Sequence, residues 1–399
     1  MTAITFPTPV RRELSQRATF GLLASALVAL LASSSAPTPL YATYQRLWDF
    51  SDVTLTVVFG VYAVAVLVSL LVFGSLSDHV GRRPVLGMAL AFQALVMLLF
   101  AFAGDLDALL LARVLQGLAT GAAVGAIGAG LVDIHAARGA IANASSAMAG
   151  TASGAMVSAL FVQLLPSPTE MVYLALSLVF LAQTAGVWFA PESSPRRRGA
   201  LPALKPTLAV PAKARGALLI AAPSLIAVWA LAGFFASLGP SVAALITRSN
   251  SVLLGGLTLL AVAGSGSLTI LAFHSVEPRR FALIGAGLTI AGVALVLLAL
   301  SLESAPVFFI GGVLAGAGFG GGFQGGLRTI VPLAEPHERA GLLSIAYLIS
   351  YLAMGIPAIG AGVLATDLGL TATARIFGGA VIVLAALTAI GLTSSRDRK

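Results

Sequence analysis

Residues 74–84, GSLSDHVGRRP, place an acid, a histidine and two arginines between two long apolar runs. Asp78 stands four residues before Arg82, a spacing at which the two side chains can form an ion pair. If the flanking runs are helices, Asp78 lies at a carboxyl end and Arg82 and Arg83 at an amino end, where the helix dipole disfavours each charge. Asp78 therefore needs a partner, either an arginine of this loop or the amino end of another helix.

Two further arginines lie inside apolar runs. A charge near the centre of a bilayer costs roughly 2.5–3.5 kcal/mol, so each should face a cavity or a partner. For Arg113, which has Gln116 one turn further on, a functional role is favoured over a structural one. Gln324 lies one turn before Arg328 and predicts a polar stripe into a cavity, although the Arg328 side chain could instead extend to the membrane surface.

Hydroxyl-bearing residues and prolines interrupt two apolar runs at corresponding places. They are Ser34, Pro37, Thr38 and Tyr41 in the first run, and Ser237 and Pro240 in the seventh. Proline frees backbone carbonyls in a helix, and paired interruptions of this kind indicate a substrate-binding or gating region. Hydrogen bonding between helices is the alternative. Tyr347 and Tyr351 share one face of the eleventh run, where helix packing and gate lining both remain open.

The titratable residues form no catalytic set. All fifteen carboxylates fall in loops or at the ends of runs, so Asp52, at the mouth of the second run, is the best candidate proton carrier. The alternative is a solvated loop acid that caps the second run. The chain has no cysteine, and its four histidines lie in loops or at run ends, so we expect no enzyme activity, metal or cofactor.

The elements that position these residues are membrane helices. The mean hydropathy is +0.99, and 58% of the 399 residues are hydrophobic. A helix needs roughly 20 apolar residues to cross a bilayer. On that basis the sequence predicts an all-α protein with twelve membrane spans, at 18–40, 52–73, 84–104, 107–132, 140–165, 168–190, 217–243, 252–273, 281–302, 306–331, 340–364 and 371–393.

A basic, proline-rich segment, residues 191–215, divides the spans into two sets of six. We therefore expect an N-terminal bundle over residues 1–190, a linker over 191–215 and a C-terminal bundle over 216–399. Similar segments recur in the two sets, such as RVLQGLATGA (113–122) and GVLAGAGFGG (312–321). The offset between the matched segments stays near 200 residues, which indicates a duplicated six-helix unit, and parallel repeats of this kind are typical of transporters.

Lysine and arginine predict the orientation. Of 23 such residues, only Arg46, Arg248 and Arg375 face outward if both termini are cytoplasmic, and two lie within spans. The other 18 face inward: Arg11, Arg12, Arg17, Arg82, Arg83, Arg138, six in the linker, Arg279, Arg280, Arg339, Arg396, Arg398 and Lys399. This bias explains the net charge of +8 without a nucleic-acid partner. We expect a multi-pass protein of the plasma membrane, as a monomer.

The motifs resemble those of the major facilitator superfamily. The pattern G-x-L-x-D-x-x-G-R-R-P resembles its signature between spans 2 and 3, and it falls on Gly74, Leu76, Asp78, Gly81, Arg82, Arg83 and Pro84. The two glycines would permit close approach and a tight turn. RVLQG, at residues 113–117, is similar to the span 4 motif, and PESSP, at residues 191–195, is similar to the run that ends span 6.

The resemblance implies roles for individual residues. Asp78 would contact the amino end of span 11 and join Arg82 and Asp133 in a charge cluster that closes the cytoplasmic side. Arg113 would take part in proton coupling. By the same resemblance, spans 1, 4, 7 and 10 would line a central cavity and spans 2, 5, 8 and 11 would form the gates. The residue patterns described above add the candidate substrate contacts Ser34, Pro37, Thr38, Tyr41, Ser237, Pro240, Tyr347 and Tyr351, and the candidate coupling or cavity residues Gln116, Gln324 and Arg328.

The resemblance extends to the drug/proton antiporter branch, with one departure. Span 5 has Gly150 and Gly154, but Ala155 stands where the antiporter signature has proline. We expect secondary active efflux of small amphipathic compounds, coupled to protons, by alternating access. Proton-coupled uptake of a small organic solute is the alternative, and a non-transporting membrane protein is disfavoured because no soluble domain or catalytic set is present.

Overall fold

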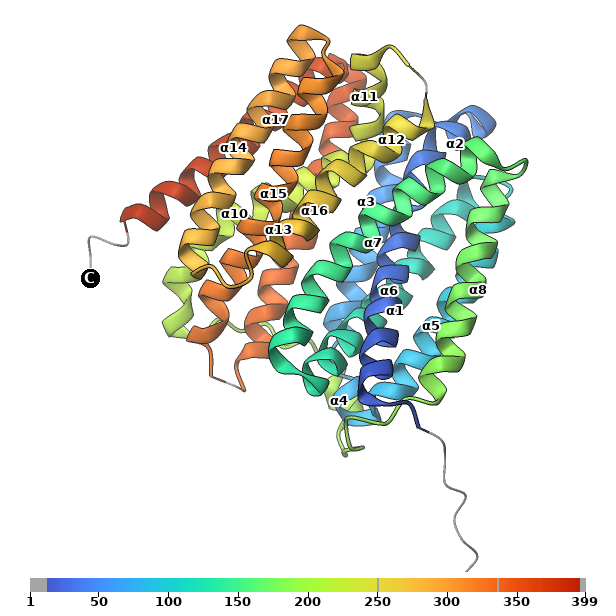
Figure 1. Cartoon of the computed structure of the whole chain (residues 1–399), viewed down its shortest axis with the longest axis vertical. Helices are drawn as coiled ribbons and strands as arrows, with labels where there is room; N and C mark the ends of the chain where they lie inside the picture. The colour runs from blue at the N-terminus through green and yellow to red at the C-terminus, as the bar shows by residue number, and fades with distance from the viewer. Residues whose placement is uncertain (1–12, 250, 336, 395–399) are drawn as a thin grey trace, which may run out of the picture.

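The computed structural model describes residues 13–249, 251–335 and 337–394. No strand occurs within these ranges, and twelve helical segments are long and apolar enough to cross a membrane, which confirms the expected all-α fold (Figure 1). The terminal basic residues used for the predicted orientation, Arg11, Arg12, Arg396, Arg398 and Lys399, lie outside the described residues.

The first half contains α1 (Gln16–Ser35), a 3₁₀ turn (Thr38–Leu40), α2 (Tyr41–Trp48), α3 (Asp52–Phe73), α4 (Ser77–Val80), α5 (Arg82–Ala101), α6 (Leu106–Ile134), α7 (Ala136–Leu164) and α8 (Pro168–Trp188). Between the halves lies α9 (Ala200–Ala203). The second half contains α10 (Ala212–Ser237), α11 (Gly239–Thr247), α12 (Val252–Leu259), a π-helical turn (Leu260–Gly264), α13 (Ser265–Ala272), α14 (Pro278–Leu302), α15 (Ala305–Ile330), a 3₁₀ turn (Val331–Leu333), α16 (Arg339–Leu368) and α17 (Leu370–Ser394).

Two predicted spans are broken helices. The first ends as α1 at Ser35, just before Pro37, and resumes as α2 at Tyr41. The seventh ends as α10 at Ser237 and resumes as α11 at Gly239, with Pro240 in the first turn of α11. Proline has no backbone N–H to continue the helical hydrogen bonds, and both breaks lie beside prolines. Pro223 and Pro357, by contrast, lie inside the continuous helices α10 and α16.

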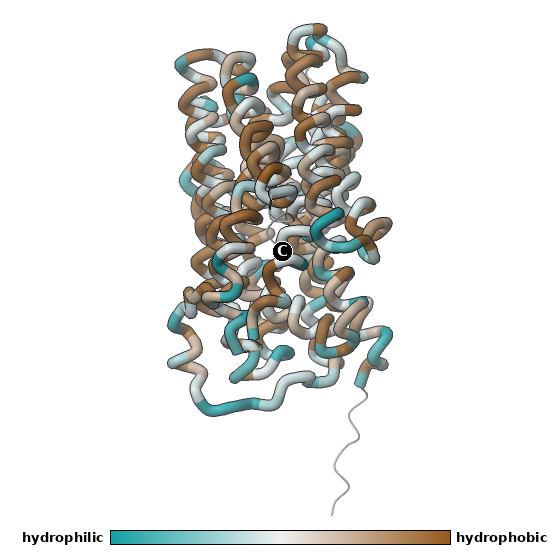
Figure 2. The backbone as a smooth tube through the Cα atoms, turned by 90° about the vertical axis from the view of Figure 1, so that its left-hand side faces the viewer, coloured by the Kyte–Doolittle hydropathy of each residue, from teal (hydrophilic) through white to brown (hydrophobic). Residues whose placement is uncertain are grey.

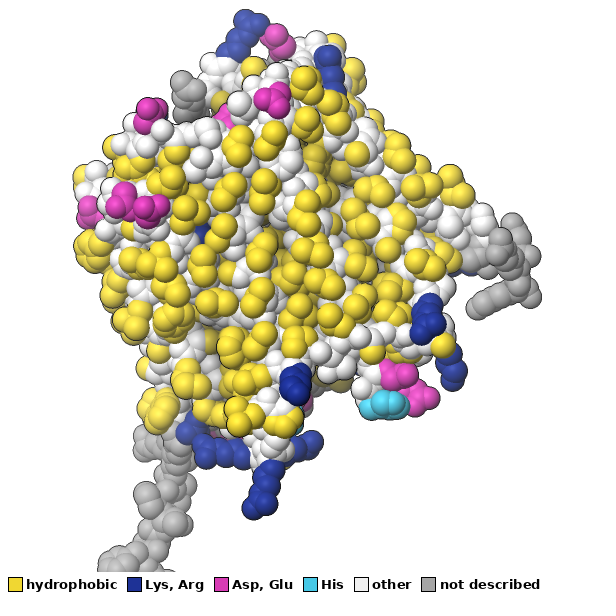
Figure 3. All heavy atoms as spheres, turned by 180° about the vertical axis from the view of Figure 1, so that it is seen from behind, with side chains coloured by type: hydrophobic (Ala, Val, Ile, Leu, Met, Phe, Trp, Pro, Cys, Tyr) yellow, Lys and Arg dark blue, Asp and Glu magenta, His cyan; other side chains and the backbone are white. Residues whose placement is uncertain are grey.

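The surface of the helices is that of a membrane protein. Hydrophobic residues fill the middle of most helices, and hydrophilic residues gather toward their ends (Figure 2). On the face shown in Figure 3, apolar side chains form a broad band with charged side chains mainly above and below it. Large apolar side chains such as Leu219, 75% exposed, would be unfavourable in water but suit contact with lipid.

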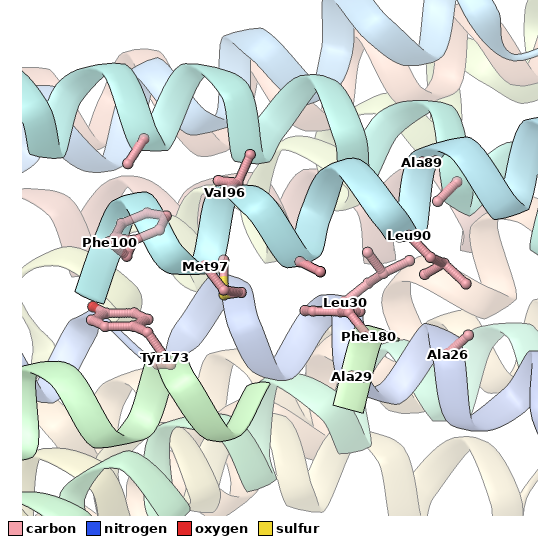
Figure 4. Close-up of a cluster of buried hydrophobic side chains, with 14 of the residues drawn as sticks. Ala26, Ala29, Leu30, Ala89, Leu90, Val96, Met97, Phe100, Tyr173 and Phe180 are labelled. Atoms are coloured by element: carbon pink, nitrogen blue, oxygen red, sulfur yellow. The ribbon is translucent and has the colours of Figure 1, made fainter. Parts of the chain in front are cut away.

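The core of the first half includes side chains of α1, α5 and α8, together with others from α2, α3 and α6. Leu30 of α1, Leu90 and Met97 of α5, and Phe180 of α8 are completely buried in one apolar cluster (Figure 4). The rings of Phe100 and Tyr173 stack with centroids 4.9 Å apart. This apolar packing fixes α1 relative to the rest of the half, and therefore fixes the place where α1 breaks.

Glycines bring α14 and α15 together in the second half. A Cβ added to Gly285 would overlap the backbone at Gly322, and one added to Gly325 would lie 2.5 Å from the Ala282 nitrogen. Helices in lipid associate through such small-residue faces, because apolar burial alone does not favour contact between them. The glycine-rich span 10 therefore has a packing role.

The two halves meet along two pairs of helices. In one pair, α3 packs on α16, where a Cβ on Gly60 would lie 2.7 Å from the Ile359 side chain and one on Gly362 would overlap the Thr56 hydroxyl. In the other, α7 packs on α12 and α13, and the Ser267 hydroxyl donates to the Ser145 carbonyl at 2.9 Å. At the first of these contacts the halves share a buried apolar cluster, made by Phe59 and Ala63 of α3 with Met354 and Ala358 of α16.

Candidate functional site

The break in span 1 exposes backbone carbonyls that side chains of α6 and α7 satisfy. Arg113 Nη1 donates to the Ser34 carbonyl at 2.9 Å, and Gln116 Nε2 donates to the Ser33 carbonyl at 2.9 Å. The Ser158 hydroxyl donates to the Ala36 carbonyl at 2.6 Å. Arg113 and Gln116 are three residues apart on α6, so they present one polar face to the broken helix.

Arg113 is a buried cation surrounded by neutral groups. Its side chain is 0% exposed, and besides Ser34 it donates to Gln116 Oε1 at 2.8 Å and to the Tyr41 hydroxyl. Its guanidinium lies over the rings of Tyr41, at 5.6 Å, and Tyr62, at 5.2 Å. No carboxylate pairs with it among the described residues, and its Nε has no acceptor there.

A pocket of about 630 Å³ lies between the halves, on the face opposite the 74–84 segment and the linker. The first half contributes Thr38, Tyr41, Gln45, Arg46 and Asp49 to its wall, and the second half contributes Ser237, Pro240, Ser241 and Ser251. Four of the residues predicted as substrate contacts are thus brought together: Thr38, Tyr41, Ser237 and Pro240. The other two from the broken spans, Ser34 and Pro37, are not in this wall.

An aromatic cluster of the second half lies beside the apolar cluster that α3 and α16 share. The Trp229 ring lies 5.8 Å from Phe319, 5.4 Å from Phe323 and 5.1 Å from Tyr351, and its buried Nε1 has no acceptor among the described residues. Helical spacing in the sequence predicts Tyr351 but misses the other three. The sequence feature that could have indicated this cluster is Trp229, one of three tryptophans, which stands in the middle of a predicted span.

The remaining predicted residues of the second half are only partly exposed. Tyr347 and Gln324 are half-buried. Arg328 Nη2 donates to the Val276 carbonyl at 2.8 Å, while its Nη1 is buried without a partner among the described residues. Arg328 therefore turns toward the loop before α14.

On the face opposite the pocket, three charged side chains of the 74–84 segment and α6 come together. Arg82 pairs with Asp78, donates from Nε to Asp133 at 3.1 Å and donates to the Ser77 hydroxyl at 2.7 Å. Gly74 lies close to α6, since a Cβ on Gly125 would be 3.3 Å from the Gly74 backbone. No hydrogen bond or ion pair joins Asp78 to α16 within the described residues.

Glu192 of the linker resolves the unfavourable placement of the two arginines. Its carboxylate accepts the backbone N–H groups of Arg82 and Arg83, at 2.8 and 3.1 Å, and so caps the amino end of α5. Gly81 has φ +106° and a Cβ there would lie 2.6 Å from Glu192 Oε2, so this position requires glycine. The Arg83 guanidinium lies 5.4 Å from the Trp188 ring centroid.

Asp52 lies on the surface of the protein, at the amino end of α3. Its side chain is exposed in the first turn of α3 and accepts a hydrogen bond from Gln45 at 3.0 Å. The residue that caps α3 is Ser51, whose hydroxyl accepts the Thr54 N–H. The alternative that Asp52 caps the helix is therefore wrong by one residue, because the acid begins the helix and Ser51 precedes it.

The sequence matches the Major Facilitator Superfamily over residues 20–277, which is more than half of the chain. The chain belongs to this superfamily. Within it, the chain is 32% identical over 81 residues to an uncharacterized MFS-type transporter, YybF of Bacillus subtilis (strain 168). That alignment covers 20% of this chain and 20% of the curated relative.

Two solved structures share the superfamily fold with this chain. A mutant of the nucleoside transporter NupG superposes with a TM-score of 0.72 at 12% identity, and the human organic anion transporter MFSD10 (TETRAN) with 0.67 at 16% identity. Each alignment covers 94% of this chain and 100% of the other. At these identities the likeness establishes the fold alone.

Proposed function

We propose that this transporter exports small amphipathic molecules in exchange for protons, by alternating access. The observation that supports this most directly is the 630 Å³ pocket whose wall comes from both halves. A volume of this size suits a drug-sized molecule. A site shared by two bundles changes shape whenever the bundles rock against each other, as alternating access requires.

The proposed orientation places the pocket on the outside. With both termini in the cytoplasm of a plasma-membrane protein, the 74–84 segment and the linker lie inside and the pocket lies on the outer side. The moving units are then residues 1–190 and 216–399, joined by the linker at 191–215. We expect the monomer to be sufficient, because one chain supplies both walls of the pocket.

The charge cluster of Asp78, Arg82 and Asp133 is the proposed inner gate. Asp78 is half-exposed at 50%, and it has no bond to α16 among the described residues, so it is free to make one when the inner side closes. Gly74, Gly81 and Arg83 hold the segment in place for that step. Glu192 caps α5 through the backbone N–H groups of Arg82 and Arg83, which leaves the arginine side chains available for the charge cluster.

Proton coupling has to use groups near the helix ends. Every carboxylate in the described membrane helices lies in the first or last turn, so no acid is available at mid-span. Asp52 and Asp49 at the pocket side and Asp133 at the gate side are the candidate carriers. Arg113 contributes by holding the broken helix between them, together with Gln116.

Flux in proteoliposomes tests the proposal. We expect vesicles containing the purified protein to move radiolabelled naphthalene derivatives against their gradient when an opposing pH gradient is imposed, and Asp78→Asn to abolish this flux. Asp107→Asn, an exposed acid at the start of α6, is the control and should keep wild-type flux. Equal flux with and without the pH gradient would remove proton coupling, and normal flux in Asp78→Asn would remove the gate.

Uptake is the second candidate, favoured by the polar wall of the pocket. Hydroxyls of Thr38, Ser237, Ser241 and Ser251 could receive a hydrophilic solute from the outside. The nucleoside transporter with the same fold carries a solute of that kind by its description. The sign of the flux under a fixed pH gradient separates uptake from export.

A further inference from the structure

The protein encloses one charge that its own described residues do not neutralise. Arg113 is fully buried, yet its partners are a carbonyl, an amide oxygen, a hydroxyl and two aromatic rings. The carboxyl end of α1 gives partial compensation, because a helix terminus carries about half a negative charge. A buried cation normally has an acid as its partner, and here that partner is missing among the described residues.

One side chain, that of Tyr41, belongs both to the pocket wall and to the surroundings of Arg113. Tyr41 lines the pocket wall, and its hydroxyl accepts a hydrogen bond from Arg113, whose guanidinium carbon lies 5.6 Å from the Tyr41 ring centre. Tyr41 is 2% exposed, so its side chain is almost completely buried beside the pocket. It lies at the start of α2, immediately after the 3₁₀ turn of the broken span, where a short segment can move without unwinding a long helix.

We propose that the cargo carries an anionic group, a carboxylate or its equivalent, and that this group binds Arg113 in place of the Tyr41 hydroxyl. A guanidinium binds a carboxylate through two parallel N–H donors. One such donor, Arg113 Nε, has no acceptor among the described residues. Displacing the Tyr41 side chain would extend the pocket toward Arg113 as the cargo binds. The inference rests on the proposed function and adds the charge of the substrate to it.

The charged residues at the rim of the pocket do not favour an anionic ligand over a neutral or cationic one. Arg46 and Asp49 both line the wall, so the rim offers one charge of each sign, and both residues are exposed to solvent. Exposed charges interact weakly because water screens them. The buried Arg113 is therefore the group that distinguishes an anion from a neutral or cationic molecule of the same shape.

Three ligands of one shape test the inference on purified protein in detergent: 1-naphthoate, 1-naphthamide and 1-naphthylmethylammonium. We expect naphthoate alone to raise the thermal unfolding temperature. In Tyr41→Phe the hydroxyl that competes for Arg113 is gone while the ring remains, so naphthoate should bind more tightly, by about fivefold for one hydrogen bond.

Tyr44→Phe is the matched control. Tyr44 is on the same short helix, is also 2% exposed, and bonds through its hydroxyl to Tyr173 at 3.2 Å instead of to Arg113. It should leave naphthoate affinity unchanged. Arg113→Gln, which keeps a donor for the Ser34 carbonyl, should weaken naphthoate binding by about tenfold or more, the loss expected for a charge-assisted hydrogen bond.

The outcomes separate this inference from the proposed function. Stabilisation by all three ligands alike, or an equal effect of Tyr41→Phe and Tyr44→Phe, would overturn the anion site even if flux were observed. Naphthoate binding that responds to Tyr41→Phe as expected, in a protein that moves none of the three, would support the anion site and overturn the transport proposal. If Arg113→Gln does not fold, the comparison of the two tyrosine variants still decides.

Discussion

At the scale of single residues, charge is placed where backbone groups can neutralise it. Glu277 precedes α14 and accepts the N–H groups of Arg280 and Arg279, at 2.9 and 3.0 Å. These backbone donors, with the Arg280 N–H the strongest, lower the pKa of the Glu277 carboxyl below its ordinary value of 4.5. Folding therefore favours the ionised carboxylate.

This lowered pKa predicts how pH affects stability. The ionised cap stabilises the fold above pH 4.5, and its contribution is lost as the pH falls through the lower folded pKa. Thermal unfolding of wild type and Glu277→Gln should therefore differ most near neutral pH and converge as the pH falls below the ordinary pKa, with wild type the more stable at neutral pH. A difference that stays constant over this range would contradict the assignment.

The sequence identified many of the charged residues but few of their partners. Arg113 and Gln116 could be predicted from their polar character inside an apolar run. Their acceptors are backbone carbonyls 79 and 83 residues away, which no side-chain pattern reveals. Glu192 is part of a motif visible in the sequence, yet its target is the start of a helix 110 residues earlier, so its role as a cap appears only in three dimensions.

At the scale of elements, each half has a helix whose amino end is capped by a glutamate, but the two glutamates come from different parts of the chain. Both α5 and α14 begin with a pair of arginines near a proline, and in both a glutamate accepts the two arginine N–H groups. For α14 the glutamate directly precedes the helix. For α5 it comes from the linker, which also donates from Ser193 to Asp133 at 3.0 Å and from the Arg197 N–H to the His79 carbonyl at 2.8 Å.

Removing the linker's cap should therefore release the linker. We predict that Glu192→Ala lowers the free energy of unfolding by about 1 kcal/mol, as is usual for a lost cap. It should also speed trypsin cleavage at the exposed Arg196–Arg198 several-fold. Glu277→Ala removes the equivalent cap of α14 and should cost similar stability without changing cleavage at the linker. Equal cleavage in both variants would show that Glu192 does not hold the linker.

At the scale of the whole molecule, hydropathy predicted the twelve spans, and the internal repeat predicted two sets of six. The breaks in spans 1 and 7 followed from proline. Which helices would meet between the halves could not be derived, because the contacts of α3 with α16 depend on single glycines in a chain that contains 43 of them. The aromatic cluster around Trp229 was hidden for a similar reason, since aromatic residues in lipid-facing and buried positions look alike in sequence.

The proposed alternating access requires α3 and α16 to separate near the pocket face during each transport cycle. The chain has no cysteine, so Thr56→Cys with Gly362→Cys introduces the only disulfide. The two Cβ positions are 3.0 Å apart, close enough to be bridged after a small helix shift. Ala221→Cys with Gly326→Cys, 3.8 Å apart within the second half, is the matched control.

The decisive measurement is naphthoate flux in proteoliposomes containing each double-cysteine variant, before and after oxidation and again after reduction. We predict that oxidation abolishes flux in the Thr56→Cys, Gly362→Cys protein, that reduction restores it, and that the control pair keeps its flux throughout. Undiminished flux through protein fully cross-linked between α3 and α16 would contradict a transport cycle in which the two halves rock against each other.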